Sequence, residues 1–433
     1  MRYYSTRNKN EAASFATAAL AGLAPDGGLY IPEEIPEYPA AVKRSLGSMA
    51  YTDIAFQTIR PWVEGDIPLV ALEEMIHAAY PFAPQVAQVG SRFALELFHG
   101  PTAAFKDFGA RFMARAFSYL RRGEEKPLKI LVATSGDTGG AVADGFFGVE
   151  GISVTVLYPK GRVSPLQERQ IAGLGGNITA LAVDGSFDDC QRLVKQAFGD
   201  TDLNRRIALS SANSINISRL IPQIAYYAFA SGQAPGAVLS IPSGNFGNIT
   251  AGLYAQKMGA PISRFIAATN INKTVPDYLE TGNYTARLSA ATLSNAMDVG
   301  APSNFERMTA HFSHAEMCRL ILGASVTDDE TRQTIADVFS RWGYYLDPHT
   351  AVGWRAIDKL EQAGHLAASS ANSPSSVGVL STAHPAKFAE TVEPLTCPVP
   401  VPPPLQKALE RLINAREIPA DLCALVEILK ECL

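Results

Sequence analysis

The stretch 99-HGPTAAFKDF-108 places one lysine between two aromatic residues, shortly after a Gly-Pro turn signal. The apolar residues of 95–98 indicate a short buried strand before it. After it, apolar residues recur at the spacing of a helix face, at Phe108, Phe112, Met113 and Phe117. Lys106 is therefore predicted to lie at a strand–loop–helix junction, near the N-terminus of a helix.

This position predicts an unusual lysine. The partial positive charge of a helix N-terminus disfavours a cation, and burial between Phe105 and Phe108 lowers the pKa of an amine further. A neutral lysine amine is a nucleophile that forms Schiff bases with aldehydes. The alternative is that the Lys106 stem packs on Phe105 while the amine reaches water. On this stretch alone both interpretations stay open.

The composition excludes several classes of partner. The chain has 433 residues, 47% of them hydrophobic, and a formal net charge of −5. We see no basic arm for nucleic acid, no apolar run long enough to cross a bilayer and no signal peptide. The five cysteines are far apart, which favours the reduced cytoplasm. No spacing of histidines and cysteines predicts a metal site.

The chain divides into three regions by pattern. Residues 1–90 are mostly helical, 91–390 alternate strands with helices, and 391–433 are predicted to form a C-terminal helical tail of one or two helices. The strand-like runs of the middle region are 130–133, 152–158, 178–183, 238–242, 265–268 and 377–380. Such alternation predicts an α/β fold with parallel sheets covered by helices. Residues 367–376 read as a low-complexity linker or surface loop.

Three junctions after these strands are rich in Gly, Ser, Thr and Asn: 134–140, 242–248 and 381–385. Ligands of open α/β sheets bind at such strand ends. In the second junction, Gly244 and Gly247 allow successive amides to point inward, and a helix N-terminus follows, which is an arrangement that binds phosphate. The alternative is a tight turn with Asn in left-handed conformations.

A fourth stretch, 210-SSANSINISR-219, is dense in neutral hydrogen-bonding groups and ends in a cation. Arg219 is predicted to lie in the first turn of a helix, where the helix dipole disfavours a positive charge. An anionic ligand offsets that clash. The alternative is a helix N-terminus capped by these polar side chains.

An amine at Lys106, an amide cradle for phosphate and polar loops at strand ends together predict a pyridoxal 5′-phosphate enzyme. The same segments resemble the threonine synthase family. The resemblance runs from residue 1 to about 390 and rests on SFATAALAGLAPDGGLYIP (14–32), HGPTAAFKDFGARFMA (99–114), ATSGDTGGAV (133–142), SSANSINISRLIPQIAYY (210–227), IPSGNFGNITAG (241–252), TLSNAMDVGAPSNFER (292–307) and STAHPAKF (381–388).

The resemblance implies the tryptophan-synthase-β-like fold, also called fold type II. Two α/β lobes hold the cofactor between them, with a small lobe at about 125–215 inserted in the large lobe and an extra N-terminal domain. The implied enzyme is a carbon–oxygen lyase acting on phosphates. It converts O-phospho-L-homoserine and water into L-threonine and phosphate, by Schiff-base chemistry with γ-elimination of phosphate and β-addition of water. This is the last step of threonine biosynthesis, expected in the cytoplasm and carried out by a monomer or homodimer.

The resemblance also implies roles for residues. Lys106 bonds the cofactor aldehyde and then acts as the general base. The implied cofactor-binding residues are Asp137 beside the 3′-oxygen, Thr382 at the pyridine nitrogen, and Gly244, Asn245, Phe246, Gly247 and Asn248 at the phosphate. The implied substrate-binding residues are Ser135, Gly136 and Thr138 at the carboxylate, and Asn213, Ser214 and Arg219 at the phosphate, with Asn216 as a neighbour.

Two alternatives stay open at this level. A phospholyase of the same family type releases 2-oxobutyrate, ammonia and phosphate instead of threonine. A catalytically silent family member acts as a binding or regulatory protein, and the presence of Lys106, the 244–248 loop and Thr382 argues against it. Dehydratases of the same fold need no second phosphate site at Ser214 and Arg219.

Overall fold

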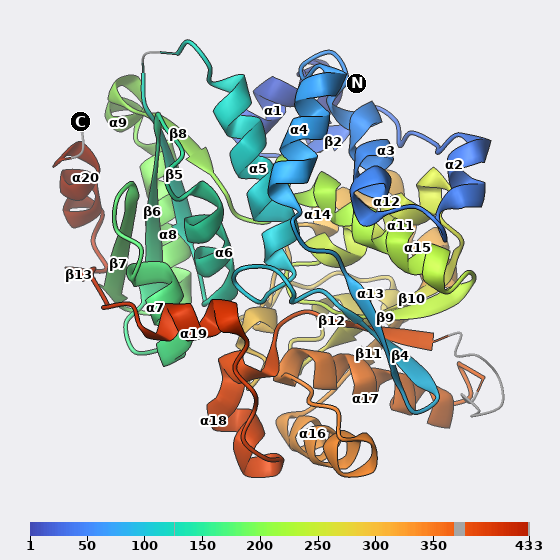
Figure 1. The fold of residues 1–433 in the computed structure, drawn as a ribbon. Coiled ribbons are helices and arrows are strands. Elements are labelled where there is room, and N and C mark those ends of the chain that lie inside the picture. Colours follow the sequence, from blue (N-terminus) through green and yellow to red (C-terminus); the bar gives the residue numbers. More distant parts are fainter. Residues whose placement is uncertain (125, 368–376, 432–433) are drawn as a thin grey trace.

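The computed structural model describes residues 1–124, 126–367 and 377–431 (Figure 1). Two open sheets form the centre of the molecule, and helices cover both. The predicted linker 367–376 lies outside the described residues except for position 367. None of the helices in the described ranges is both long and apolar enough to span a membrane.

The N-terminal region contains four helices, but they cover fewer than half of residues 1–90, so it is less helical than expected. Its two strands, β1 (Tyr3–Ser5) and β2 (Tyr30–Pro32), pair in an antiparallel sheet. Its helices are α1 (Phe15–Ala21), α2 (Ala40–Ser45), α3 (Tyr51–Val63) and α4 (Leu69–Ala79). The buried Tyr3 hydroxyl donates a hydrogen bond of 2.6 Å to the carbonyl of Trp62 in α3, so the small sheet and the helices form one unit.

The larger sheet has six strands in the order β11-β10-β9-β12-β4-β3. All neighbours are parallel except the hairpin of β3 and β4 at one edge. The strands are β3 (Gln85–Val89), β4 (Arg92–Glu96), β9 (Ala237–Pro242), β10 (Ile262–Thr269), β11 (Ile321–Ser325) and β12 (Val377–Ser381). The runs predicted at 238–242, 265–268 and 377–380 are thus confirmed as strands of this sheet.

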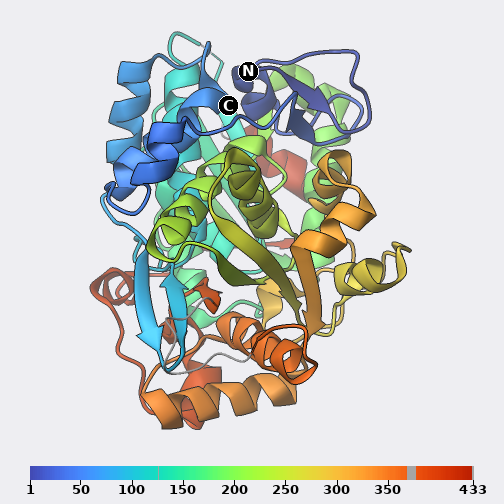
Figure 2. The same ribbon diagram turned by 90° about the vertical axis from the view of Figure 1, so that its right-hand side faces the viewer.

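Helices pack on both faces of the larger sheet, as predicted for buried parallel strands. In Figures 1 and 2, α16 and α17 lie below the sheet, and α11 and α12 lie above it, on the side of the N-terminal helices. The helices of this region are α10 (Ile217–Leu220), α11 (Ile224–Gln233), α12 (Gly247–Met258), α13 (Thr274–Thr281), α14 (Phe305–His311), α15 (His314–Leu320), α16 (Asp328–Trp342) and α17 (Pro348–Gln362). Short 3-10 turns are η1 (Ile221–Gln223) and η2 (Asn295–Met297).

The smaller sheet has five parallel strands in the order β13-β7-β6-β5-β8. Four of them come from the middle of the chain: β5 (Leu128–Ala133), β6 (Ile152–Pro159), β7 (Ile178–Asp184) and β8 (Ala208–Ser211). Helices α6 (Asp137–Phe146), α7 (Pro165–Ala172), α8 (Phe187–Gly199) and α9 (Thr201–Arg206) connect them. This unit corresponds to the small lobe implied at about 125–215.

The C-terminal region corrects the prediction of a purely helical tail. Helices α19 (Pro403–Leu409) and α20 (Leu422–Glu431) are present, but β13 (Ala415–Pro419) lies between them. This strand adds in parallel to β7 and becomes an edge of the smaller sheet. Two residues of β13 are charged, Arg416 and Glu417, and both are exposed, which suits an edge strand but hides its strand pattern in the sequence. Before α19 come η3 (Pro385–Phe388), α18 (Ala389–Val392) and η4 (Glu393–Leu395).

Helix α5 (Lys106–Leu120) packs between the N-terminal helix α4 and helix α6 of the smaller sheet (Figure 1). It begins at Lys106, as the pattern predicts. The ring of Phe108 does not sandwich the amine as expected but joins an aromatic cluster with Tyr51, Tyr80 and Phe82, at ring distances of 5.1 to 5.9 Å. This cluster holds the first turn of α5, and therefore the start of the Lys106 side chain, in one position.

Candidate active site

A cavity of about 370 Å³ opens where loops from both sheets meet the start of α5. The loops that follow β5, β9 and β12 all reach it, as expected for the carboxyl ends of parallel strands. Of the predicted site residues, the cavity is lined by Lys106, Ser135, Asp137, Thr138, Asn213, Ser214, Arg219, Gly244, Asn245, Phe246, Gly247, Asn248 and Thr382. Residues that are as much as 276 positions apart in the chain therefore share one site.

Lys106 extends from α5 into this cavity with a side chain that is 15% exposed. Its Nζ lies 5.5 Å from the centre of the Phe105 ring and 4.0 Å from Oδ2 of Asp137. Burial lowers the pKa of the amine to about 8, and the positive charges of Lys387 and Arg219 act in the same direction. The negative charge of Asp137 partly opposes them. The amine is therefore much closer to its neutral form at physiological pH than an ordinary lysine.

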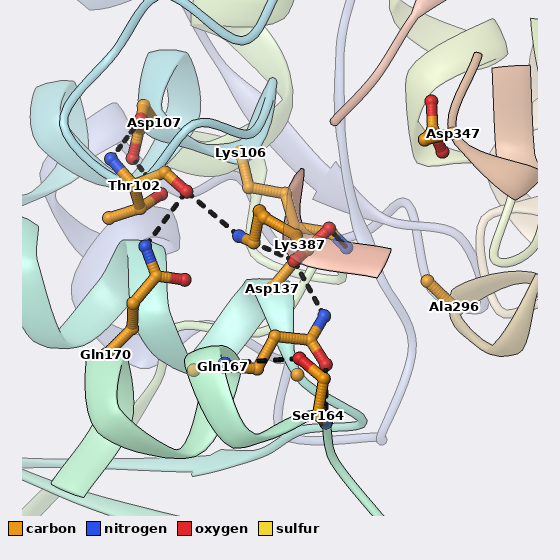
Figure 3. Close-up of polar contacts among 12 residues, drawn as sticks. Thr102, Lys106, Asp107, Asp137, Ser164, Gln167, Gln170, Ala296, Asp347 and Lys387 are labelled. Atoms are coloured by element: carbon orange, nitrogen blue, oxygen red, sulfur yellow. Dashed lines mark hydrogen bonds and ion pairs between the residues drawn. The ribbon is translucent and has the colours of Figure 1, made fainter. Parts of the chain in front are cut away.

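Asp137, the first residue of α6, has a closer partner than Lys106 (Figure 3). Its Oδ1 lies 2.7 Å from Nζ of Lys387 and accepts a hydrogen bond of 2.9 Å from the Gln167 amide. The two lysines and the Gln167 hydrogen bond hold the pKa of the Asp137 carboxyl well below its usual range, against the effect of burial. Asp137 is thus a buried carboxylate at physiological pH.

The loop after β9 leads into the N-terminus of α12, where the first backbone N–H groups have no partner within the helix. Phe246 precedes this helix in the left-handed conformation, with φ of 59°. At Gly244, an added Cβ would lie 2.7 Å from the carbonyl oxygen of Ala296, so only glycine fits. The Asn248 carboxamide oxygen accepts hydrogen bonds from the hydroxyls of Tyr226 and Tyr227, at 2.6 and 2.7 Å.

The Arg219 side chain is buried and lines the cavity. One of its terminal nitrogens donates to the carbonyl of Ala212, while its Nε has no hydrogen-bond partner in the parts of the chain that the structure describes. Gly109 of α5 makes room for it, because a Cβ there would lie 2.9 Å from that Nε. Burial lowers the pKa of Arg219 to about 10. The guanidinium therefore adds a desolvated positive charge to the cavity wall.

Ser214 joins Arg219 on the same side of the cavity. Its hydroxyl accepts a hydrogen bond of 2.6 Å from the Asn245 side-chain amide, which links the loop after β8 to the loop after β9. The side-chain oxygen of Asn213 is buried and, among the described residues, has no partner. Unpaired buried polar atoms of this kind are costly without a ligand and favourable when one binds.

Two predicted residues are not among the described residues that line the cavity. Gly136 lies under the side chain of Gln167, where a Cβ would come within 2.5 Å. Asn216, expected as a neighbour of the substrate, is fully buried and caps α10 by accepting from the Ser218 backbone, while its amide donates to the carbonyl of Ala19. Its role is to tie α10 to α1.

The structure adds residues for which the sequence predicted no role. His349 lines the cavity from α17, bonds Asp347 through Nδ1 at 2.8 Å and accepts from the Ala296 backbone at 3.3 Å. The segment 295–301 lines the cavity as well. Lys387 is a third residue without a predicted role; it does not line the cavity but contacts Asp137, which does. Residues 295–301 and Lys387 lie in the segments 292–307 and 381–388, whose family resemblance was their only signal in the sequence. His349 lies outside the segments that carry the resemblance, so nothing in the sequence analysis indicated it.

The family models match the whole described architecture. The "Threonine synthase N terminus" model matches residues 2–80, "Pyridoxal-phosphate dependent enzyme" matches 78–380, and "Threonine synthase, C-terminal" matches 350–429. The chain belongs to the threonine synthase family. Among curated relatives, the threonine synthase of Escherichia coli is 43% identical over 438 residues, covering 99% of each chain. That of Saccharomyces cerevisiae is 36% identical, covering 90% of this chain and 88% of its own.

Solved structures of threonine synthases share the fold. The Escherichia coli structure is 41% identical with a TM-score of 0.91, covering 100% of both chains. A pyridoxal-phosphate-bound threonine synthase from Brucella melitensis is 37% identical with a TM-score of 0.90, covering 100% of this chain and 99% of its own. The protein is thus a pyridoxal-phosphate-dependent enzyme that acts on a small-molecule substrate.

The residues of the cavity fit this cofactor. The group needs an amine for its aldehyde and a cradle for its phosphate. Lys106 has the amine of lowered pKa, and the loop at Gly244 packs so closely on the backbone of Ala296 and Met297 that it has no room for a Cβ. The side-chain nitrogen Nδ2 of Asn248 is buried and has no hydrogen-bond partner among the described residues. It is therefore a donor that is free to bind an anion.

Proposed function

We propose that the protein converts O-phospho-L-homoserine and water into L-threonine and phosphate. The observation that carries the proposal is that one cavity holds a lysine amine of lowered pKa and two separate groups suited to anions. The 244–248 loop is suited to the cofactor phosphate, and Arg219 with Ser214 to a second phosphate. A substrate that brings its own phosphate explains the second group.

We assign the cofactor-binding residues from the family resemblance, and their position in the cavity lining supports the assignment. Lys106 bonds the cofactor aldehyde, Thr382 contacts the pyridine nitrogen, and Asp137 lies beside the 3′-oxygen. The phosphate is held by the loop residues Gly244, Asn245, Phe246, Gly247 and Asn248. When bound, pyridoxal phosphate withdraws electrons from the substrate and makes its C–H bonds next to the amine acidic.

We assign the substrate-binding residues to the segments that follow β5 and β8, which include the first turns of α6 and α10. Ser135 and Thr138 bind the substrate carboxylate, and Gly136 sets the path of the loop between them. The substrate phosphate is held by Asn213, Ser214 and Arg219. Arg219 contributes most to this binding, because a desolvated guanidinium makes strong, charge-assisted hydrogen bonds to phosphate oxygens.

Lys106 then handles the protons of the reaction. Once substrate has replaced it, its amine is neutral and takes the proton from Cα as a general base. The amine gives up this first proton, which is restored to Cα at the end, and then takes a proton from Cβ as phosphate leaves Cγ and delivers that proton to Cγ. Water adds its oxygen at Cβ and loses a proton to the released phosphate, which completes threonine. One flexible amine serves all three carbons, since they are consecutive atoms within its reach.

We further propose that the chain divides into an N-terminal domain at 1–90, a catalytic region at 91–390 and a C-terminal tail at 391–433. We also propose that the protein works in the cytoplasm as a monomer or homodimer. The five cysteines, which lie far apart in the sequence, support the location. Light scattering on the purified protein measures the oligomeric state directly.

The product of the reaction tests the function. Purified protein with pyridoxal phosphate is incubated with O-phospho-L-homoserine, and amino acids, keto acids and phosphate are quantified. We expect L-threonine and phosphate in equal amounts, and neither product with Lys106→Ala. Release of 2-oxobutyrate and ammonia in place of threonine would identify a phospholyase and overturn the proposal.

A further inference from the structure

Two lysines and one carboxylate are buried together at the cavity wall. Asp137 lies between Lys387 and Lys106, at 2.7 Å from the first Nζ and 4.0 Å from the second. Lys387 is more deeply buried than Lys106, with a side chain that is 0% exposed. The shorter, charge-assisted contact with Asp137 is therefore made by Lys387, which does not line the cavity, and not by Lys106.

Lys387 is held in this position from two sides (Figure 3). Its Nζ donates a hydrogen bond of 2.9 Å to the carbonyl of Thr102, in the loop that leads to Lys106. Gln170 donates to the same carbonyl at 3.1 Å, and Gln167 donates to Asp137 at 2.9 Å. These contacts join the turn after β12, the loop before α5 and the N-terminus of α6.

This arrangement matters because of what an unpaired carboxylate would do to Lys106. A buried carboxylate about 4 Å from an amine favours the protonated amine. The nucleophile and general base must be the neutral amine. A second positive charge that lies closer to the carboxylate, that of Lys387, opposes this effect at Lys106.

We propose that Lys387 is a positioning residue of this enzyme: it holds Asp137 as its own ion-pair partner and thereby leaves the Lys106 amine able to lose its proton. The proposal rests on the assignment of Lys106 as the reacting amine. The charged groups that act on Lys106 come from four elements: Asp137 at the start of α6, Arg219 of α10, Asp347 before α17 and Lys387 of η3. Of these groups, Asp137 favours the protonated form of the Lys106 amine and Lys387 disfavours it, and the two form an ion pair with each other.

The sign of this effect is measurable on Lys106 itself. The full-length chain, freed of cofactor, is acetylated briefly at a series of pH values, and the modified fraction of Lys106 is measured by mass spectrometry. Lys387→Met should move the midpoint of the Lys106 profile up by about one pH unit, the lower end of shifts caused by a neighbouring charge. Asp137→Asn should move it down.

A matched control separates this role from a structural one. Lys129 of β5 is also buried, at 3% exposure, but does not line the cavity. Lys129→Met should leave the Lys106 midpoint unchanged. If Lys387→Met folds poorly, the double variant Asp137→Asn/Lys387→Met removes both charges, and its midpoint should lie between those of the single variants.

The proposal is overturned if the midpoint of the Lys106 acetylation profile is the same in Lys387→Met as in Lys129→Met. It is also overturned if Lys387→Met moves this midpoint to lower pH. Shifts of the same sign for Lys387→Met and Asp137→Asn would also overturn it, because a loosened fold exposes the amine in both. The assay needs neither substrate nor turnover. A protein that released 2-oxobutyrate would therefore fail the proposed function and could still pass this test.

Discussion

The carboxylate of Asp107 accepts two hydrogen bonds from Thr102, one of 2.9 Å from the backbone N–H and one of 2.6 Å from the hydroxyl. Both residues are buried. The contact closes the loop 102–107 into a ring, and Lys106 leaves that ring at the first residue of α5. The direction of the reactive amine is thus set by its immediate neighbour in sequence.

Removing this contact should destabilise the loop. Asp107→Ala leaves the Thr102 N–H and hydroxyl buried without their acceptor, which costs about 1–3 kcal/mol for each such group. We expect a lower free energy of unfolding in urea and reduced cofactor content. A variant with unchanged stability and full cofactor content would show that the ring does not hold Lys106.

Asp107 should also make stability depend on pH. Burial raises the pKa of its carboxyl from 3.8 to about 7. Between these values the folded chain binds more protons at this site than the unfolded chain, so the contribution of Asp107 to the free energy of unfolding falls as pH rises. Urea titrations from pH 4 to 7 should show this fall relative to Asp107→Asn. Parallel curves for the two proteins would contradict the prediction.

Gly244 should be essential for holding the cofactor. A Cβ at this position would lie 2.7 Å from the Ala296 carbonyl oxygen and 2.8 Å from the Met297 Cα, both backbone atoms that cannot yield cheaply. Gly244→Val should therefore abolish uptake of pyridoxal phosphate, measured by equilibrium dialysis. Gly199 is the matched control, because its Cβ would meet no atom within 4 Å. Normal uptake of pyridoxal phosphate by Gly244→Val would show that this loop does not hold the cofactor phosphate.

Arg219 should determine recognition of the substrate phosphate. We expect Arg219→Ala to weaken binding of O-phospho-L-homoserine by about 2–4 kcal/mol, the scale for losing a buried charged contact. Binding of unphosphorylated L-homoserine should change far less. Isothermal titration of the cofactor-loaded protein measures both affinities.

Arg307 provides the comparison for Arg219. It is equally buried, but its guanidinium is occupied by the carbonyl of Tyr30, the side chain of Asn304 and the carbonyl of Ile215. Arg307→Ala should lower stability without changing the ratio of the two affinities. If Arg219→Ala weakens the binding of O-phospho-L-homoserine and of L-homoserine equally, then Arg219, like Arg307, has a structural role and does not recognise the phosphate.

The lowered pKa of Lys106 predicts how fast the cofactor-free protein takes up pyridoxal phosphate at different pH. The reactive neutral amine increases as pH rises through about 8, so the uptake rate should rise to this pH and then level off. Stopped-flow absorbance measures the rate. A rate that still rises past pH 10, as for an ordinary lysine, would show that burial does not act on Lys106 as the structure indicates.

Most of the fold could be predicted because its central strands are apolar and bounded by turn residues. The strand β6 (Ile152–Pro159) is such a run, and it is buried between β5 and β7. The sequence failed for peripheral strands. The edge strands β8 (Ala208–Ser211) and β13 (Ala415–Pro419) lack a continuous apolar run: β8 ends in two serines, and β13 carries the exposed Arg416 and Glu417. Their strand character comes from pairing with a neighbour that is distant in sequence.

The site residues also divide into those that local sequence reveals and those that depend on contacts between distant parts of the chain. Lys106 and the 244–248 loop are local arrangements, so their spacing in the sequence was informative. Lys387 was missed because its contact with Asp137 joins residues 250 positions apart, through the turn of η3. Asn216 was expected near the substrate because of the family resemblance, yet its side chain turns toward Ala19. Orientation of this kind depends on packing that a single sequence does not display.

Borohydride reduction of the cofactor-loaded protein tests the central claim that Lys106 is the amine that binds the cofactor. Reduction fixes the cofactor covalently on the lysine that holds it, and peptide mass spectrometry then locates the added group. The account predicts one added phosphopyridoxyl group, on the peptide that carries Lys106. A group on Lys387 or on any other lysine, or no added group at full cofactor content, would contradict it.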